Sequence, residues 1–272
     1  MSERLTVMAV HAHPDDEVLG TGGILSRYAD EGIRTVLVTC TNGEQGDAPG
    51  GVKPGEPGHD EAAVSALRLE ELRASVTHLG IEHVELLGYR DSGMDGWDGN
   101  KAEDAFANVP VERAAARLAE LMERYRPQVV VTYDENGGYG HPDHIQAHRI
   151  AVAAAETSQI PEKLYYTAVP RERMAELSEL LRSAGVAPEE LELPDDFGVP
   201  EAQITAMIDV TPYVERKRKA LEAHASQGDS IFMLRMPPEA LHQVLGTEGF
   251  IRAINRVPGA ADREDDLFDG LR

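Results

Sequence analysis

The strongest constraint on the fold is a regular alternation between short β-branched runs and longer segments in which apolar residues recur every three or four positions. This alternation is typical of βαβ units, whose parallel strands form one sheet covered by the connecting helices. The first four strands are expected near residues 5–11, 34–40, 83–88 and 128–133. Helices are expected at Glu17–Glu31, Glu61–Leu79, Val111–Tyr125 and about Asp143–Glu156.

The C-terminal part of the chain continues the pattern with weaker signals. There we expect a strand near 164–169, a helix near 170–184, a strand near 204–210 and a helix near 212–225. A chain of 272 residues is long enough to bury one large core. The sequence therefore predicts an α/β fold: a Rossmann-like, mostly parallel sheet with helices on both faces.

Polar segments follow each of the first four strands, and this placement predicts where a ligand binds. The segments are HPDDE, NGEQGD, YRDSGMD and DENGGYGHPDH, in chain order. All four would lie at the carboxyl ends of the strands, the edge that holds the ligand in doubly wound sheets. The strand order 3-2-1-4-5 would place strands 1 and 4 side by side, so that the two histidine-rich loops face each other. The active site is therefore expected at this edge.

Composition narrows the partners and the compartment. With 26 basic and 48 acidic residues the net charge is −22, which disfavours nucleic acid and anionic membranes as partners. We find no signal peptide and no apolar run long enough to span a bilayer, so a cytoplasmic protein is expected. The single cysteine, Cys40, excludes an internal disulfide framework and a thiolate zinc site, and its place in an apolar strand predicts a buried, inert thiol.

The two histidine-rich loops carry the residue types that bind a divalent metal. A catalytic metal typically has three deprotonated nitrogen or oxygen ligands and one open position for water. His13 and Asp16 would supply a pair of ligands close in sequence, and His144 a distant third. Pro14 and Pro142 stiffen the loops, as a coordination sphere requires.

Each acidic residue taken singly has a simpler explanation. An aspartate before a helix is usually an N-cap, which would account for Asp15, Asp16 and Asp143 one at a time. Two H-P-D segments on converging loops are poorly explained by capping alone, and we favour a metal site. His11 is expected to be a structural residue at the end of the first strand.

The motif pair HAHPDDE and YDENGGYGHPDH, with NGEQGD and YRDSGMDG between, resembles the LmbE-like (PIG-L) family of zinc-dependent N-deacetylases. Within the family it is most similar to the mycothiol-pathway deacetylase of N-acetylglucosaminyl-inositol and the mycothiol S-conjugate amidase. The resemblance covers residues 5 to about 155 well, and AHASQ at 223–227 and DDLFDGL at 265–271 also resemble segments of that pair. It implies a metal-dependent hydrolase that removes an N-acyl group from a glucosaminide.

Matching positions imply a role for each residue of the site. One Zn²⁺ per chain, or Fe²⁺ in the cell, would be bound by His13, Asp16 and His144. Asp15 would act as general base on the metal-bound water and return the proton to the leaving amine. The oxyanion would be stabilised by the metal together with Tyr139 and His141. Asp143 would orient His141.

The resemblance also implies substrate contacts and a division of the chain. Arg68 and Asp91 would contact hydroxyls of a glycoside. An alternative for Arg68 is that it is an ordinary exposed residue of a helix. Trp97 would either stack on a sugar or close a small satellite core. Residues 1–160 would form the Rossmann-like metal-binding catalytic core, and 161–272 a C-terminal α/β extension of the same domain that completes the substrate pocket. The partner is a small amino-sugar conjugate, and a homo-oligomer is compatible with the sequence.

Several alternatives stay open at this stage. The resemblance leaves the mycothiol S-conjugate amidase as an alternative. After HPDDE the chain continues VLGTGG, which is less polar than in either member of the mycothiol pair, so a deacetylase of another N-acylated glucosaminide, including a secondary-metabolite intermediate, is a further hypothesis. Two histidines and one aspartate also match non-haem Fe(II) oxygenases, but those use β-barrels. His144 and His148 resemble the zincin pair, yet Ile145 occupies the place of the catalytic Glu. A noncatalytic sugar-binding protein would not need Asp15. The segment GTGG at 20–23 suggests a nucleotide-binding protein, but its spacing does not match G-x-G-x-x-G and a carboxylate cluster precedes it. Residues 46–58 are either a disordered connection or a mobile flap.

Overall fold

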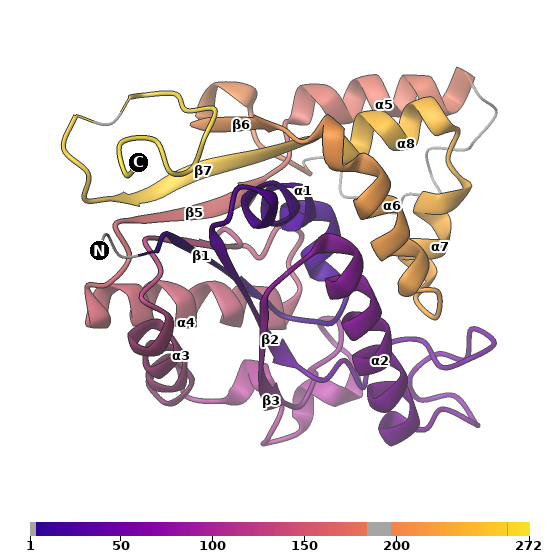
Figure 1. Cartoon of the computed structure of the whole chain (residues 1–272). Coiled ribbons are helices and arrows are strands. Elements are labelled where there is room, and N and C mark those ends of the chain that lie inside the picture. Colours follow the sequence, from indigo (N-terminus) through magenta and orange to yellow (C-terminus); the bar gives the residue numbers. More distant parts are fainter. Residues whose placement is uncertain (1–3, 184–196, 260) are drawn as a thin grey trace.

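The computed structural model describes residues 4–183, 197–259 and 261–272 and shows a seven-stranded sheet with helices on both faces (Figure 1). The strands are β1 (Thr6–His11), β2 (Arg34–Thr41), β3 (His83–Tyr89), β4 (Val129–Thr132), β5 (Lys163–Ala168), β6 (Ala206–Asp209) and β7 (Thr247–Asn255). The α-helices are α1 (Asp16–Asp30), α2 (Glu61–Leu79), α3 (Val111–Tyr125), α4 (Pro142–Ser158), α5 (Arg171–Ser183), α6 (Val214–Ala223), α7 (Gly228–Arg235) and α8 (Pro238–Leu245). The predicted α/β class is confirmed.

The sheet order is β3-β2-β1-β4-β5-β7-β6, and the first five strands are parallel. The predicted order 3-2-1-4-5 is therefore confirmed, with β1 and β4 adjacent where the winding reverses. The sequence did not predict β7, which pairs antiparallel with both β5 and β6. It also did not predict α7 and α8, the two short helices that precede β7.

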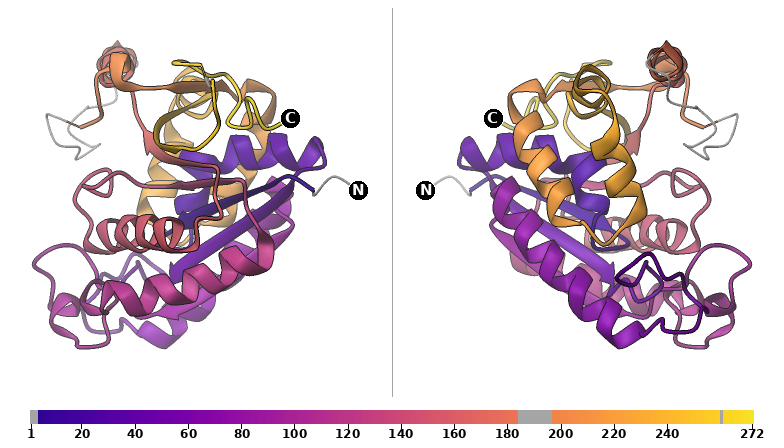
Figure 2. Two further views of the ribbon diagram at one scale, coloured as in Figure 1. Left: turned by 90° about the vertical axis from the view of Figure 1, so that its left-hand side faces the viewer. Right: turned by 90° about the vertical axis from the view of Figure 1, so that its right-hand side faces the viewer.

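Two apolar cores lie on opposite faces of the sheet because alternate side chains of each strand point to opposite sides. In β1, Val7 and Ala9 belong to the core under α1, α2, α6 and α8. Met8 and Val10 belong to the other core, under α3 and α4. Figure 2 shows the two groups of helices on either side of the strands. Every residue of β1 is buried, as expected for a central parallel strand covered on both faces.

Helix α1 is fixed to the C-terminal part of the chain by a buried ion pair. The Glu248 carboxylate at the start of β7 accepts hydrogen bonds from the backbone amides of Gly23 and Ile24, at 2.7 and 2.9 Å. The ammonium group of Lys217 in α6 lies 2.6 Å from the same carboxylate. A Cβ atom on Gly23 would lie 2.4 Å from Cβ of Val210, so only glycine allows this close packing.

The segment 46–58, between β2 and α2, forms turns closed by a β-bridge between Ala48 and Val52. His59 Nε2 lies 2.9 Å from the carbonyl oxygen of Gly46, and the amide of Asp47 donates to Oε1 of Gln227 at 3.3 Å. The segment is thus tied at its start to His59, two residues before α2, and to Gln227 in the C-terminal part of the chain. Its use as a mobile flap stays a prediction.

Other expectations can be located in the fold. Cys40 is fully buried in β2, and burial raises the pKa of its thiol, as the prediction of an inert thiol requires. Among the described residues, no helix has the length and apolarity needed to cross a bilayer. Residues 1–3 of the predicted catalytic core, and residues 184–196 and 260 of the predicted extension, lie outside the described residues; residue 184 is also the last of the helix predicted near 170–184.

Candidate active site

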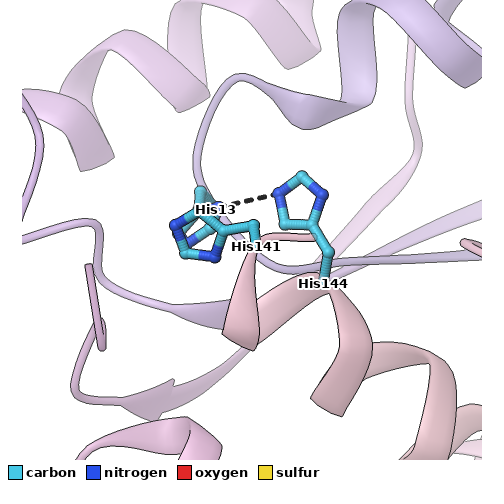
Figure 3. A group of neighbouring side chains, drawn as sticks. All are labelled: His13, His141 and His144. Carbon is cyan, nitrogen blue, oxygen red and sulfur yellow. Dashed lines mark hydrogen bonds between the residues drawn. The ribbon is translucent and has the colours of Figure 1, made fainter. Parts of the chain in front are cut away.

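The loops after β1 and β4 meet at the carboxyl edge of the sheet. The β1–α1 loop carries His13, and His141 and His144 lie at the start of α4. Figure 3 shows the three rings turned toward one another, and an atom from each lies within 4.8 Å of the others. The two histidine-rich segments therefore face each other as the strand order predicted.

The three predicted ligands lie close to one another. His144 Nε2 lies 3.2 Å from His13 Nδ1, and the Asp16 carboxylate lies 3.3 Å from each of these nitrogens. A tetrahedral ion with bonds of about 2.0–2.1 Å separates its ligand atoms by about 3.3–3.4 Å. His13 Nδ1 and His144 Nε2 lie close to this separation. The two Asp16 distances go to different oxygens, Oδ2 toward His13 and Oδ1 toward His144, and Oδ2 also accepts from the backbone amide of His13. That these three residues bind the metal stays a prediction.

His13 and His144 each have a hydrogen-bond partner on the ring nitrogen that is not part of the contact between them. His13 Nε2 lies 3.3 Å from Oδ2 of Asp143, and His144 Nδ1 lies 3.1 Å from the carbonyl oxygen of Gly137. Because both partners are oxygens that only accept while Asp143 is ionised, the two ring nitrogens donate to them. In a neutral ring the other nitrogen would then keep its lone pair, as metal-binding histidines require. Without a metal, and against the effect of burial, the carboxylates of Asp91, Asp143 and Asp16 raise the pKa of His13 well above its usual value, and a hydrogen bond joins its Nδ1 to Nε2 of His144.

His141 has the opposite arrangement. Its Nδ1 accepts a hydrogen bond from the backbone amide of Asp143 at 3.1 Å, so the neutral ring carries its proton on Nε2. Burial, together with the nearby His13 and His144, lowers the pKa of His141 to about 2. This histidine is a neutral hydrogen-bond donor, which suits an oxyanion more than a cation.

The carboxylate of Asp143 does not orient His141; the contact to His141 is made by the Asp143 backbone amide. The carboxylate is fully buried, accepts from the amide and hydroxyl of Ser92, and contacts His13. His13, Asp91 and Asp143 also lie within 4.8 Å of one another and form a second group that could hold a metal ion; both carboxylates accept backbone hydrogen bonds, as Asp16 does. Ser92 was missed, although it lies in the polar segment YRDSGMD after β3.

Asp15 lies beside the predicted ligands without belonging to their cluster. Its Oδ2 lies 2.9 Å from Nη2 of Arg68, and its backbone has φ of 125°, a conformation that non-glycine residues rarely adopt. Burial raises the pKa of Asp15 to about 6, against the opposing charge of Arg68. The side chain makes no capping hydrogen bond to α1, so the N-cap explanation fails for this residue.

The capping explanation also fails for the other two aspartates. Asp16 is the first residue of α1 and accepts a hydrogen bond from the backbone amide of His13 at 2.7 Å. The N-cap of α4 is His141, not Asp143.

Arg68 and Asp91 are buried, with only 4% and 2% of their surfaces exposed. The guanidinium of Arg68 donates to the carbonyl oxygens of Pro14 and Gly43, at 2.7 and 2.8 Å. Asp91 accepts from the amide of Gly93 at 2.8 Å. The alternative of an exposed helix residue is therefore wrong for Arg68, and both predicted substrate contacts already have partners inside the protein.

Two tyrosines flank the ring of His144. Tyr139 is 45% exposed, with its ring centre 5.0 Å from that of His144. Tyr133 was missed by the sequence reasoning; its buried ring stacks on His144 at 4.2 Å, and its hydroxyl accepts from the amide of Ala12 at 3.0 Å. His11 contacts this hydroxyl and Thr21, the structural role expected for it.

The remaining candidates lie outside the cluster. His148 contacts the carbonyl oxygen of Tyr133 at 3.0 Å and is not part of the metal-binding groups. Trp97 is 41% exposed and lies over Gly93, which leaves both of its predicted roles open.

Residues 8–155 match the family model described as PIG-L, GlcNAc-PI de-N-acetylase. The chain belongs to the PIG-L family. Two relatives support this assignment over nearly the whole chain, and both are named 1D-myo-inositol 2-acetamido-2-deoxy-alpha-D-glucopyranoside deacetylase (the first with the suffix 1). The one from Catenulispora acidiphila is 40% identical over 97% of this chain and 89% of its own length. The one from Acidothermus cellulolyticus is 40% identical over 98% of this chain and 95% of its own length.

Solved structures agree on the PIG-L fold. The N,N'-diacetylchitobiose deacetylase from Pyrococcus horikoshii has a TM-score of 0.57 at 20% identity, covering 91% of this chain and 83% of that one. GalB, a 4-carboxy-2-hydroxymuconate hydratase from Pseudomonas putida, has a TM-score of 0.60 at 22% identity, covering 94% and 99%. A hydratase among the neighbours shows that the fold alone does not fix the reaction. The family and its deacetylase members make this PIG-L chain an amide hydrolase, as predicted, with a group of residues that could hold its metal.

Proposed function

We propose that this protein is a zinc-dependent deacetylase that hydrolyses the acetamide of N-acetylglucosaminyl-inositol. One observation carries the proposal: His13, Asp16 and His144 converge at metal-ligand spacing while the neighbouring carboxylate of Asp15 stays outside the cluster. A noncatalytic sugar-binding protein needs no such extra carboxylate. The substrate is inferred from the two relatives named 1D-myo-inositol 2-acetamido-2-deoxy-alpha-D-glucopyranoside deacetylase, which match over nearly the full chain.

The chemistry divides between the metal and the side chains. A divalent ion bound by His13, Asp16 and His144 would act as a Lewis acid on the amide carbonyl and lower the pKa of water to about 7. Asp15 then takes a proton from the attacking water and delivers it to the leaving amine.

The oxyanion is the second demand of the reaction. His141 carries its proton on Nε2 and donates it as a hydrogen bond to the carbonyl oxygen while negative charge develops there. Tyr139, exposed at the edge of the same cluster, supplies a second donor. Asp143 acts through His13, whose ring it holds in the orientation that frees Nδ1.

The C-terminal extension, residues 161–272, is proposed to complete the substrate pocket. Support comes from the AHASQ segment, 223–227, which begins at the last residue of α6. Ser226 donates to Glu71 in α2, and Gln227 contacts the backbone of Asp47, at the start of the segment 46–58. The extension thereby holds two elements beside the site. Contacts from Arg68 and Asp91 to substrate hydroxyls stay a prediction.

The test is release of amine from defined substrates by the metal-stripped protein. Apoprotein receives one equivalent of Zn²⁺ or Fe²⁺ and is assayed with N-acetylglucosaminyl-inositol, a mycothiol S-conjugate and N,N'-diacetylchitobiose. Metal-dependent turnover of the inositol glycoside, at least tenfold faster than of the other two, is expected. Preference for the S-conjugate would assign the amidase activity instead. Stoichiometric metal binding without turnover of any substrate would refute the substrate assignment.

A further inference from the structure

A buried clamp holds the peptide bond between Pro14 and Asp15. The carbonyl oxygen of Pro14 accepts a hydrogen bond from Nη2 of Arg68 at 2.7 Å. On the opposite side of the same peptide, the amide of Asp15 donates to Oε2 of Glu17 at 3.0 Å. A cation and an anion thus grip the two polar groups of one peptide plane. This fixes the plane from which the Asp15 side chain projects.

Glu17 is in turn held by residues distant in the sequence. Its Oε1 accepts from the hydroxyl of Ser75 in α2 and lies 2.8 Å from Nε2 of His224, the residue after α6. Glu17 and His224 are both fully buried. His224 belongs to the same AHASQ segment as Ser226 and Gln227, but its side chain turns to Glu17 in α1 instead of to α2 or the segment 46–58.

The clamp is needed because Asp15 has an unfavourable backbone conformation. A non-glycine residue with φ of 125° is strained and persists only where its surroundings enforce it. A change of φ at Asp15 would rotate its side chain relative to the Pro14–Asp15 peptide and so displace the carboxylate. The contacts of Glu17 described above go to the Asp15 amide and to its own supports, so its effect on the reaction must pass through Asp15.

We propose that Glu17 is a positioning residue for Asp15 and that His224 holds Glu17 in place for this task. The inference rests on the proposed function, in which Asp15 is the general base. It makes the C-terminal part of the chain necessary for the rate of proton transfer, and not only for the pocket. Misplacement of a reacting group by about 1 Å can cost a hundredfold in rate, which sets the scale of the expected effect.

The test compares two substitutions at one position. His224→Leu removes the donor to Glu17, whereas His224→Gln keeps an N–H donor close to the position of Nε2. We expect kcat of His224→Leu to fall about 10- to 100-fold, with KM and Zn²⁺ affinity within about twofold of wild type. His224→Gln should recover kcat to within about threefold. Equal kcat for wild type and His224→Leu, or no rescue by Gln, would overturn the proposal.

Lys217→Met is the matched control for lost stability. It removes the cation from a second buried pair that links α6 to α1, formed by Lys217 and Glu248. This pair contacts α1 at the backbone of Leu19, Gly23 and Ile24, and none of these hydrogen bonds goes to Asp15 or Glu17. Tm should fall in both His224→Leu and Lys217→Met, and kcat should fall only in the former. An equal loss of kcat in the control would show that the effect is general destabilisation and would overturn the proposal.

A readout independent of turnover separates this inference from the proposed function. The exchange rate of the Asp15 amide hydrogen with solvent can be measured by NMR in the metal-free protein. It should rise at least tenfold in His224→Leu and stay near wild type in His224→Gln. If wild type hydrolyses none of the substrates, the substrate assignment fails, but the clamp is still tested here. Unchanged exchange in His224→Leu would contradict the clamp even in an active enzyme.

Discussion

Asp15→Asn should nearly abolish hydrolysis while leaving metal binding intact. The substitution keeps the shape of the side chain, and its amide oxygen can still accept from Arg68, which lies 2.9 Å from the Asp15 carboxylate. The three predicted ligands are untouched. The other carboxylates of the cluster already contact His13 and are not placed to replace the base: Asp16, Asp91 and Asp143.

The magnitude follows from the lost proton transfer. General base catalysis contributes about 10²- to 10⁴-fold, or roughly 3–5 kcal/mol of activation free energy, and kcat should fall by that factor. The assay is amine release at saturating N-acetylglucosaminyl-inositol, with bound metal measured by elemental analysis of the same sample. Loss of metal in parallel with activity, or a fall in kcat of less than about threefold, would refute the division of roles between Asp15 and Asp16.

Three further predictions follow from the geometry. His144→Ala should remove one of three ligands and weaken Zn²⁺ binding by at least a hundredfold, as measured by competition with a chelating dye. Gly23→Ala should destabilise the protein by about 1–3 kcal/mol in urea unfolding, because the new methyl would overlap Val210, with kcat per folded molecule unchanged. The Cys40 thiol should resist alkylation at pH 8 in the native protein and react once the protein is unfolded, since burial raises its pKa and blocks access; rapid native alkylation would contradict the described packing.

The order of the first five strands could be predicted because the signals are local. Parallel strands buried on both faces are continuous apolar runs, and the helices between them end at residues such as Gly80, which adopts a left-handed conformation with φ of 75°. β7 could not be predicted in the same way. Its sequence, TEGFIRAIN, includes charged residues and Gly249, and it becomes a strand by pairing with β5 and β6. Such pairing depends on partners distant in the sequence.

The site shows the same limit. The loops after the first and fourth strands each contain an H-P-D segment. These segments indicated His13, Asp16 and His144 because metal ligands are particular residue types on converging loops. The roles of Arg68 and Glu17 could not be read this way. A buried arginine in the middle of a helix looks like an exposed one in sequence, and only the tertiary structure brings it to the carbonyl oxygens of Pro14 and Gly43.

The sequence by itself thus determined the α/β class, the edge of the sheet that carries the site and the residue types that meet there, since all three follow from periodicity and from loops that end neighbouring strands. The tertiary structure decided which nitrogen of each histidine is available, because the tautomer depends on the partner of the other nitrogen: Asp143 for His13, Gly137 for His144 and an amide for His141. It also brought His224 to Glu17, across 207 positions of the chain. Hydrogen bonds between residues so far apart leave no periodic or local signal, and only the folded chain shows them.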